Sequence, residues 1–555
     1  MMTLSKKNKY SLLLISLACF IACLYPYIRL AENTLSLNLE DKGLLFSLQR
    51  VLNNSLTKKA ITNTFLISLL TSVFSVIFAT PLAWVLSRVE IRFSKKWTTL
   101  FSLPYAIPPF VGAIAWINLA SPSSGLLTKI VGENVLDIYS VAGLVFVLTS
   151  FFYTYILLSL LGGLKNIDSS LEEAARLSGA SGIRVFFDIS LPLLWPNIKS
   201  SALLVFLASA ASFGVPALIG SPGGIYLLTT RIYMFQKMGS LNGISAASLL
   251  SFFLIFLAIL IVTIQQLLNK NNIASVVQGK SSRISKISLG KKENFVQLGL
   301  FLLFSILFLM PVLSIFASSL SKVQGVFSFS NLTLGNFGHL IFEMPEFLTS
   351  VKNSLYLSIS VASISVLIGL ILSYVEVRTN IFGRSLVRSI PTIPFSTPGT
   401  VLALAILLSF GRRMGNISLY NTLFLIGVAY FVKYLSFAVR TISDGMRQID
   451  KSLEESSVLC GATFIRRLID LWFPILRPII ISAWFLIFMP CFSELTMTIL
   501  LTGPGLETLG TLLFQLQEYG DSGGGGAASL CVLLIIFILL INFIIKKVSK
   551  GSYGL

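Results

Sequence analysis

Long apolar stretches recur along the chain, separated by shorter segments that are rich in Lys and Arg. A helix needs roughly 20 residues to cross about 30 Å of hydrocarbon, and about 12 stretches approach this length. We therefore expect six membrane-spanning helices in each half. The predicted spans are 10–30, 60–86, 98–120, 140–163, 200–220 and 246–268, then 294–320, 351–375, 389–410, 417–441, 480–502 and 527–545.

Proline residues interrupt two of these stretches at matching places. Pro104 and Pro108 lie in the stretch 98–120, and Pro394 and Pro398 lie in 389–410. Proline removes a backbone donor and kinks helices. We expect bends at both places.

Composition supports a membrane protein. Of 555 residues, 55% are hydrophobic and 12% are charged, and the mean hydropathy is +0.85. Soluble proteins carry about 25% charged residues, so a soluble, disordered or coiled-coil chain is excluded. Five cysteines and one histidine, scattered along the chain, indicate neither a disulfide framework nor a metal site. The predicted fold class is an all-α polytopic membrane protein.

The positive charge has a topological meaning. The chain has 42 Lys and Arg against 23 Asp and Glu, a net charge of +19. Most of the basic residues fall on one side of the membrane if both termini are cytoplasmic, as the positive-inside rule requires. The excess also attracts the chain to the anionic headgroups of the lipid bilayer. No polar domain concentrates it on one face, so a nucleic-acid partner is not expected.

The two halves repeat one another in the same direction. Leu171-Glu172-Glu173 recurs as Leu453-Glu454-Glu455, and Gly179 and Pro192 recur at the same spacing as Gly461 and Pro474. Two parallel six-helix repeats place a pseudo-two-fold axis along the membrane normal, with a transport pathway between the halves. The predicted organisation is a first half at 1–268, a polar and basic cytoplasmic linker at 269–293, and a second half at 294–555.

The longest cytoplasmic segment of each half, at 165–199 and 444–479, predicts a short helix–turn–helix. In the first, Asp168 or Ser169 can cap a helix, and Gly179 permits a left-handed reversal. Pro192 is expected to end the second helix before the membrane. The small residues around the turn suit close contact with another protein.

These segments carry a known pattern of residue types: Glu-Ala-Ala, three residues, Gly, nine residues, then Ile-x-Leu-Pro. The second copy keeps the spacing at Glu455, Gly461 and Pro474, with Ser456 and Ser457 in place of both alanines. With this EAA motif the chain resembles the permeases of ABC importers. The first copy matches at Glu173, Ala174, Ala175, Gly179, Ile189, Leu191 and Pro192.

The resemblance implies a type I ABC importer permease fold, in which 165–199 and 444–479 are coupling loops that dock two copies of an ATPase subunit. ATP and Mg²⁺ would be bound by that partner, because the chain itself lacks a Gly-x-x-x-x-Gly-Lys-Ser/Thr loop. The chain is therefore expected to bind no cofactor and not to be an enzyme. The altered second motif leaves open whether both loops dock equally. The expected coupling residues are Glu172, Glu173, Ala174, Ala175, Gly179, Ile189, Leu191, Pro192, Glu454, Glu455, Gly461 and Pro474.

The family further implies a multi-pass protein of the bacterial inner membrane that receives substrate from a periplasmic or lipid-anchored binding protein and moves it by alternating access. Both halves in one chain resemble the fused permeases of ferric iron importers, as do the segments 211–220 and 228–233. Glu494 and Thr496 lie where those proteins usually read Glu-Leu-Pro-x-Thr, so Thr496 departs from the pattern. Phe213, Pro216, Glu494 and Thr496 are the candidate pathway residues.

Glu494 and Lys433 lie deep within their spans, where charged side chains usually face a bundle interior or a wet cavity. Glu494 is a candidate oxygen ligand for a hard cation, and a buried ion pair with Lys433 or a snorkelled lysine is the alternative. Thiamine, polyamine and phosphonate remain alternative substrates. A secondary transporter would leave the paired loops unexplained, and one histidine gives little support to a membrane enzyme.

Overall fold

The computed structural model describes residues 6–36, 43–132, 137–270, 286–324, 326, 328–381, 383–411, 419–520 and 525–548. Within these ranges the regular secondary structure is helical. Two isolated β-bridges, Val89–Ile287 and Ser321–Leu332, occur in the segments between helices. Most of the predicted linker, residues 271–285, lies outside the described residues.

Within the described ranges, ten helices are long and apolar enough to cross a membrane, or up to 12 if each of two bent pairs is one span. This confirms the predicted all-α membrane fold. In the first half the spans are Tyr10–Leu35 within α1 (Lys6–Leu35), α3 (Ser55–Arg88), α7 (Val141–Asn166), Gly182–Ala211 and Leu241–Leu268 within α12 (Leu241–Lys270). In the second half they are Gly290–Ser319, α16 (Pro345–Arg378), α20 (Leu423–Arg447), Phe464–Phe492 and Gly526–Ile545 within α26 (Gly526–Val548).

The bent pairs are the two stretches that contain the matching prolines. Ser94–Tyr105, which holds α4 (Ser94–Ser102), turns by 96° into α5 (Pro109–Ala120). Leu386–Ser396, which holds α17 (Leu386–Ser389) and α18 (Thr392–Ser396), turns by 106° into α19 (Gly399–Phe410). Proline disfavours helical backbone in the preceding residue, so each break falls beside Pro108 or Pro398.

Two predicted spans begin earlier than expected, and the prediction that Pro192 ends a helix is wrong. A π-helical segment, Phe186–Ser190, continues directly into α10 (Leu191–Ala211), with Pro192 in its first turn. In the second half, Arg467–Trp472 continues likewise into α23 (Phe473–Phe492). The wider π turn leaves room for the proline ring and needs no N–H from it.

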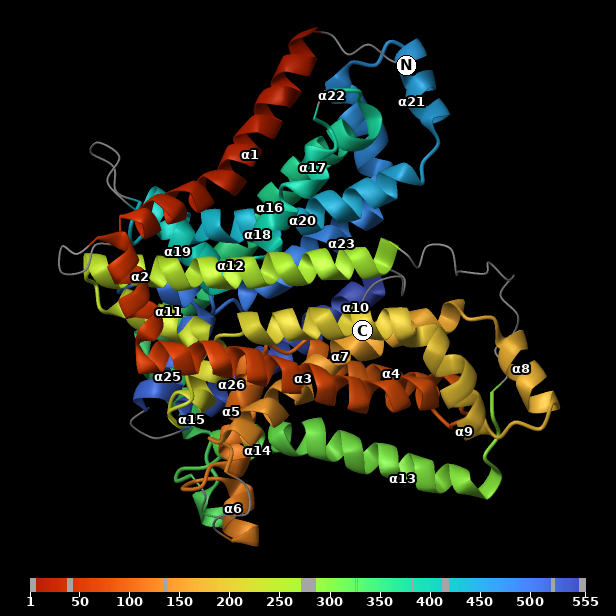
Figure 1. Ribbon diagram of the computed structural model, residues 1–555, viewed down its shortest axis with the longest axis vertical. Helices are drawn as coiled ribbons and strands as arrows, with labels where there is room; N and C mark the ends of the chain where they lie inside the picture. Colours follow the sequence, from red (N-terminus) through yellow and green to blue (C-terminus); the bar gives the residue numbers. More distant parts are fainter. Residues whose placement is uncertain are drawn as a thin grey trace.

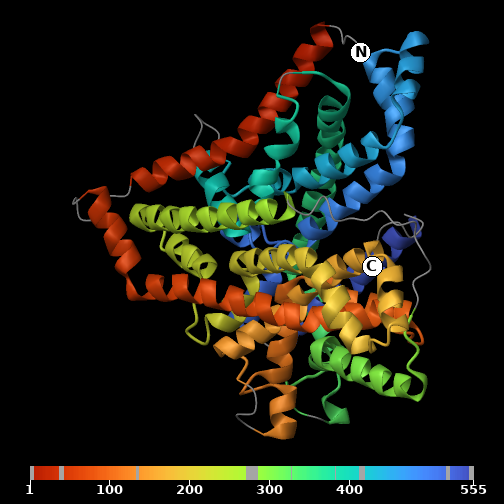
Figure 2. The same ribbon diagram turned by 45° about the vertical axis from the view of Figure 1, so that its right-hand side comes forward.

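Each half has the same core, and the halves exchange their first helices. Helices α3, α7 and α10 pack together, and so do α16, α20 and α23. Helix α1 of the first half lies against α19 of the second, whereas α14 (Met310–Ser319) of the second half packs on α5 of the first. Figures 1 and 2 show α1 along one side of the second half and α13 (Glu293–Phe304) on the opposite side of the molecule.

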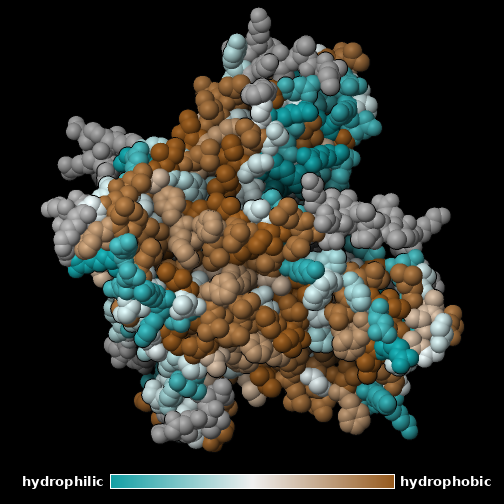
Figure 3. All heavy atoms as spheres, viewed as in Figure 1, coloured by the Kyte–Doolittle hydropathy of each residue, from teal (hydrophilic) through white to brown (hydrophobic). Residues whose placement is uncertain are grey.

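Shorter helices lie between these spans or at the start of them, and the outer surface of the molecule is strongly apolar. Figure 3 shows a broad hydrophobic face over α1, α12 and α3, as expected for helices that contact lipid. The shorter helices are α2 (Leu44–Asn53), α6 (Leu126–Val131), α8 (Ser169–Leu177), α9 (Gly182–Val185), α11 (Leu228–Lys237), α15 (Gly335–Gly338), α21 (Lys451–Leu459), α22 (Phe464–Arg466), α24 (Thr498–Leu501) and α25 (Leu509–Tyr519).

Candidate functional site

The two predicted coupling loops fold as helix–turn–helix units with closely matching backbones. The first contains α8 and α9, and the second contains α21 and α22, which lie well apart from them in Figure 1. The Asp168 carboxylate accepts the N–H of Ser170 at 3.0 Å, and Asp450 accepts that of Ser452 at 2.8 Å. The predicted cap at Asp168 is confirmed. Hydrogen bonds from Ser452 hold the pKa of Asp450 below its usual value.

A glycine in the left-handed region forms the turn of each loop. The φ angle is +87° at Gly179 and +78° at Gly461. Just after each glycine, the N–H of Ala180 donates to the carbonyl of Ala175, and that of Ala462 to the carbonyl of Ser457, both at 3.0 Å. No atom lies within 4 Å of the place where a β-carbon would be at either glycine. The backbone angle, and not space, therefore requires glycine here.

In the first loop, Glu172 faces inward. Its side chain is buried and forms ion pairs with Arg88 Nε at 2.7 Å and with Arg176 Nη2 of the loop at 3.8 Å. It also accepts a hydrogen bond from Ser190 Oγ at 2.8 Å. Arg88, at the end of α3, also donates to the carbonyl of Leu164 at 3.0 Å. Glu172 therefore joins the loop to the helical core and does not lie on the outer surface.

In the second loop, Glu454 is also buried but has different partners. It receives Arg467 Nη1 at 3.0 Å and the hydroxyl of Tyr374 at 2.6 Å. Arg378 takes the place of Arg88 at the end of its span. It donates to the carbonyls of Met446 at 2.8 Å and Ile449 at 2.6 Å. The ion pair of this loop is therefore internal to the loop, and a tyrosine connects it to α16.

The remaining predicted coupling residues lie at or near the surface. Glu455, Ala174 and both turn glycines are exposed, as are Pro192 and Pro474, whereas Glu173, Ala175, Ile189 and Leu191 are partly buried. In both loops the second of the two small residues of the motif, Ala175 or Ser457, is therefore more buried than the first, Ala174 or Ser456.

Each loop also exposes several large apolar side chains that the motif does not include, and the three most exposed occupy matching places in the two loops. In the first loop Leu177 is 89% exposed, and Ile183 and Phe187 are exposed as well. Leu459 is 89% exposed in the second loop, and Ile465 and Ile469 occupy the matching places. We call each set an exposed apolar triad. The regular repeat of these positions in the sequence could have identified them.

At the centre of the molecule, Glu494 and Lys433 cap broken helices. The Glu494 carboxylate accepts the N–H of Met497 at 2.9 Å and the N–H and hydroxyl of Thr498 at 3.0 and 2.8 Å, at the start of α24. Lys433 donates to the carbonyl of Phe395 at 3.0 Å and to that of Thr397, at the end of α18. The structure shows no ion pair between these two described residues.

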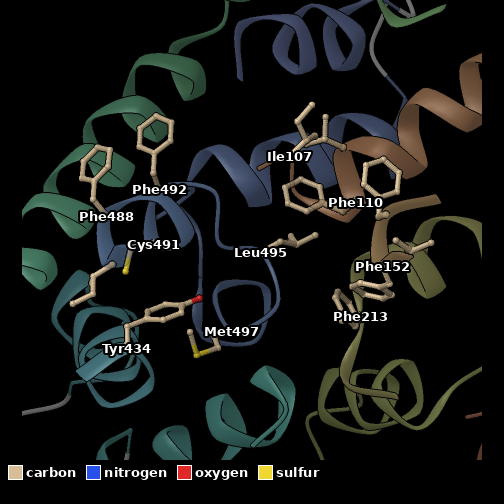
Figure 4. Packing of buried hydrophobic residues seen from close by; sticks show 14 of the residues in the cluster. Ile107, Phe110, Phe152, Phe213, Tyr434, Phe488, Cys491, Phe492, Leu495 and Met497 are labelled. Atoms are coloured by element: carbon tan, nitrogen blue, oxygen red, sulfur yellow. The ribbon is translucent and has the colours of Figure 1, made fainter. Parts of the chain in front are cut away.

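Of the other candidate pathway residues, Phe213 lies where the two halves touch. Phe213 is buried against Tyr233 and Phe514, with ring centroids 5.1 and 5.9 Å away. Figure 4 shows Leu495 between the aromatic rings of the second half and Phe110 and Phe213 of the first. Pro216 is buried and Thr496 partly buried. In the described ranges, no group of three His, Cys, Asp or Glu residues could hold a metal ion.

Comparisons with known proteins give a consistent picture. The sequence model of the family "Binding-protein-dependent transport system inner membrane component" matches residues 62–273 and 365–551. The chain is 27% identical over 508 residues to the Fe(3+)-transport system permease protein FbpB 2 of Haemophilus influenzae, covering 91% of each chain. It is 27% identical over 445 residues to the ferric transport system permease protein FbpB of Actinobacillus pleuropneumoniae, covering 78% of this chain and 63% of that protein.

A solved crystal structure is also similar, that of a bacterial alginate ABC transporter in complex with an alginate pentasaccharide-bound periplasmic protein. The TM-score is 0.37 and the sequence identity 16%, over 47% of this chain and 96% of that chain.

Proposed function

The chain belongs to the family of binding-protein-dependent transport system inner membrane components and is a permease subunit of an ABC importer, and we propose that it carries ferric iron and docks one ATPase subunit on each coupling loop. ATP hydrolysis belongs to the partner, and a substrate-binding protein delivers the cargo. The observation that carries the proposal for docking is the repetition of the exposed apolar triad at matching places in both loops.

Apolar side chains of this size are rarely left in water without a reason. Leu177 and Leu459, each 89% exposed, are the last residues of the short helices that carry the start of the family motif. A few well-packed side chains near the centre of an interface usually supply most of the binding energy. The triads therefore suit apolar grooves on two copies of the same ATPase subunit, one for each half.

The buried contacts behind each triad would transmit motion. Glu172 is tied to the end of α3 through Arg88, and Glu454 to α16 through Tyr374. A displacement of either loop therefore acts on a membrane-spanning helix of its own half. With both termini in the cytoplasm, two loops drawn together by ATP would rock the halves between inward-facing and outward-facing states.

The chain offers a direct probe of docking. Cys460 is the exposed cysteine of the second loop, and the other four cysteines are buried. We expect the ATPase to protect Cys460 from a thiol-reactive maleimide in the assembled complex. In a Cys460→Ser background, Ser178→Cys places the same thiol at the matching position of the first loop. Unchanged labelling rates at both positions after assembly would contradict docking.

Ferric iron is proposed from the names of the relatives that this chain matches over most of its length. The test is uptake into proteoliposomes that hold the permease and its ATPase, with the binding protein and ATP supplied. We expect uptake of iron but not of thiamine under the same conditions. Uptake of thiamine with no uptake of iron would contradict the substrate and leave the docking proposal intact.

A further inference from the structure

The second half contains a cavity of about 860 Å³ near the start of the second coupling loop. Its walls come from the ends of α16 and α20, from α17, and from the first residue of α21. We call it the basic cavity because five of its lining residues are basic and two are acidic. The basic residues are Arg378, Arg384, Arg388, Arg447 and Lys451, and the acidic residues are Glu376 and Asp450.

The acidic residues nearby are already engaged, including Asp444 outside the cavity lining, which forms an ion pair with Arg388 at 3.1 Å. The Glu376 side chain is 7% exposed and forms ion pairs with Arg447 and, at 3.8 Å, with Arg388. It also accepts the hydroxyl of Ser443 at 2.6 Å. Asp450 caps α21 through Ser452. Neither lining carboxylate is left to neutralise the rest of the wall.

The basic side chains of the wall have more N–H donors than the nearby acceptors use. Each guanidinium has five N–H donors, whereas Arg384 uses Nη1 for the carbonyl of Thr379 and for Asn380 Oδ1, both at 2.7 Å. The buried Nε of Arg378 has no hydrogen-bond partner among the described residues. Lys451 is exposed at the start of α21. The wall therefore offers an anion several unused donors.

The first half does not repeat this surface. At the places that correspond to Arg384, Arg388 and Lys451 it has the uncharged residues Ser94, Thr98 and Ser169. The backbone around these positions is otherwise similar in the two halves, including the bent helix pair that follows. The basic residues at these three positions are therefore particular to the second half and are not required by the shared fold.

The position of the basic cavity indicates what it could bind. It lies where α16 and α20 leave the apolar part of the molecule, and Figure 3 shows a hydrophilic surface here beside the hydrophobic face of α1. Basic pockets at this level of a membrane protein suit phosphate-bearing headgroups, and arginine binds phosphate with two parallel hydrogen bonds. We propose that the basic cavity binds a phosphate group, from an anionic phospholipid or a soluble phosphate compound.

The test compares two double variants of the full chain assembled with its ATPase. Arg384→Ala with Arg388→Ala removes two cations from the cavity wall. Lys95→Ala with Lys96→Ala removes two exposed cations from the corresponding segment of the first half. Binding is measured as cardiolipin retained from phosphatidylcholine–cardiolipin nanodiscs, by native mass spectrometry, and as inorganic pyrophosphate affinity in phosphatidylcholine nanodiscs, by calorimetry.

We expect the arginine variant to bind one of the two probes about 25-fold more weakly, roughly fivefold for each cation. The lysine variant should bind like the unaltered chain. Loss of cardiolipin alone identifies a lipid headgroup, and loss of pyrophosphate alone identifies a soluble phosphate. Arg384→Lys with Arg388→Lys should restore part of the binding, which separates loss of charge from misfolding. Equal binding by the unaltered chain and the arginine variant, or an equal loss in the lysine variant, would overturn the proposal.

Discussion

The two coupling loops have nearly the same backbone and hold a buried glutamate by different means. In the first, the nearest charge partner is Arg88, which belongs to α3 and not to the loop, and Arg176 of the loop lies farther away at 3.8 Å. In the second, the charge partner is Arg467, a residue of the loop itself, and only the hydroxyl of Tyr374 reaches the adjoining span. Turn geometry is thus repeated, whereas the connection to the core is not.

A further contact distinguishes the first loop. Ile287, just before the second half begins, exchanges backbone hydrogen bonds with Arg88 and Glu90 at 2.8 and 2.9 Å. Its side chain lies 3.3 Å from the place where a β-carbon on Gly182 would be. The first loop is therefore bound to the core by a buried charge pair and by a neighbouring segment, so we expect it to be the more rigid of the two.

The largest expected difference between the loops comes from removing their arginines. Arg88→Ala removes the nearest cation from Glu172, whose side chain is 1% exposed, and leaves it with the more distant Arg176 at 3.8 Å. Removing the partner of a buried charge typically costs about 3–5 kcal/mol. Arg467→Ala should cost less, because its ion pair with Glu454 is longer, at 3.0 Å, and both side chains are less completely buried, at 7% exposure each. Thermal unfolding of the purified permease, with and without the second substitution at the glutamate (Glu172→Gln or Glu454→Gln), measures both effects.

The paired glutamine variants are the control for this comparison. A neutral amide needs no counter-charge, so Glu172→Gln should recover much of the stability that Arg88→Ala loses. Equal losses for Arg88→Ala and Arg467→Ala would show that the origin of the arginine, from the core or from the loop, has no energetic consequence.

The exposed apolar triads should give the next largest effect, on binding and not on folding. Leu177→Asp or Leu459→Asp places a charge in the proposed interface, and a central apolar contact is worth about 2 kcal/mol or more. Both side chains are 89% exposed, so unfolding temperatures should hardly change. Affinity for the ATPase, measured by titration against nanodisc-embedded permease, should fall by about 30-fold. A variant that alters one loop alone would reveal any difference in docking strength.

The local geometry of the loops could be predicted from the sequence because it depends on neighbouring residues. The cap at Asp168 and the turn at Gly179 follow from side-chain oxygens and backbone angles within a few positions. The number of spans follows from length and apolarity in the same way. Arg88 could not be assigned to Glu172, since their contact forms only when α3 packs against the loop.

The contacts of the charged residues deep in the membrane could not be predicted from the sequence either. Glu494 and Lys433 suggested a cation ligand or an ion pair, yet each satisfies the end of a broken helix. Predicting this requires knowing where the backbone breaks inside the membrane, and unpaired backbone groups there are costly. The prediction that Pro192 ends a helix was wrong for a different reason. A π turn precedes it and makes room for a proline that would normally end a helix.

The turn glycines should respond equally in the two loops. Gly179→Ala and Gly461→Ala each place a β-carbon on a left-handed residue, at a cost of about 1–2 kcal/mol. Because the space around both positions is open, the cost arises from the backbone alone. Asparagine, which tolerates this conformation better, should cost less at both positions. Hydrogen exchange of the loop amides measures the effect, and a large difference between the loops would mean that their turns are not equivalent.

The smallest effect is expected from Tyr374→Phe, which removes one hydrogen bond to Glu454 and costs about 1 kcal/mol or somewhat more. The ion pair with Arg467 remains, so the second loop should keep its fold but lose its direct polar link to α16. If that link transmits motion, iron uptake per ATP hydrolysed should fall while ATPase binding stays unchanged. The counterpart of Tyr374 in the first half is Trp84, which packs against Phe186 with ring centroids 5.3 Å apart. Trp84→Phe retains an aromatic ring there and should leave the ratio of transport to hydrolysis unaltered, since Arg88 carries the polar link in that half. A fall in this ratio for both variants would assign the transmission to aromatic packing, and not to the polar contacts that distinguish the loops.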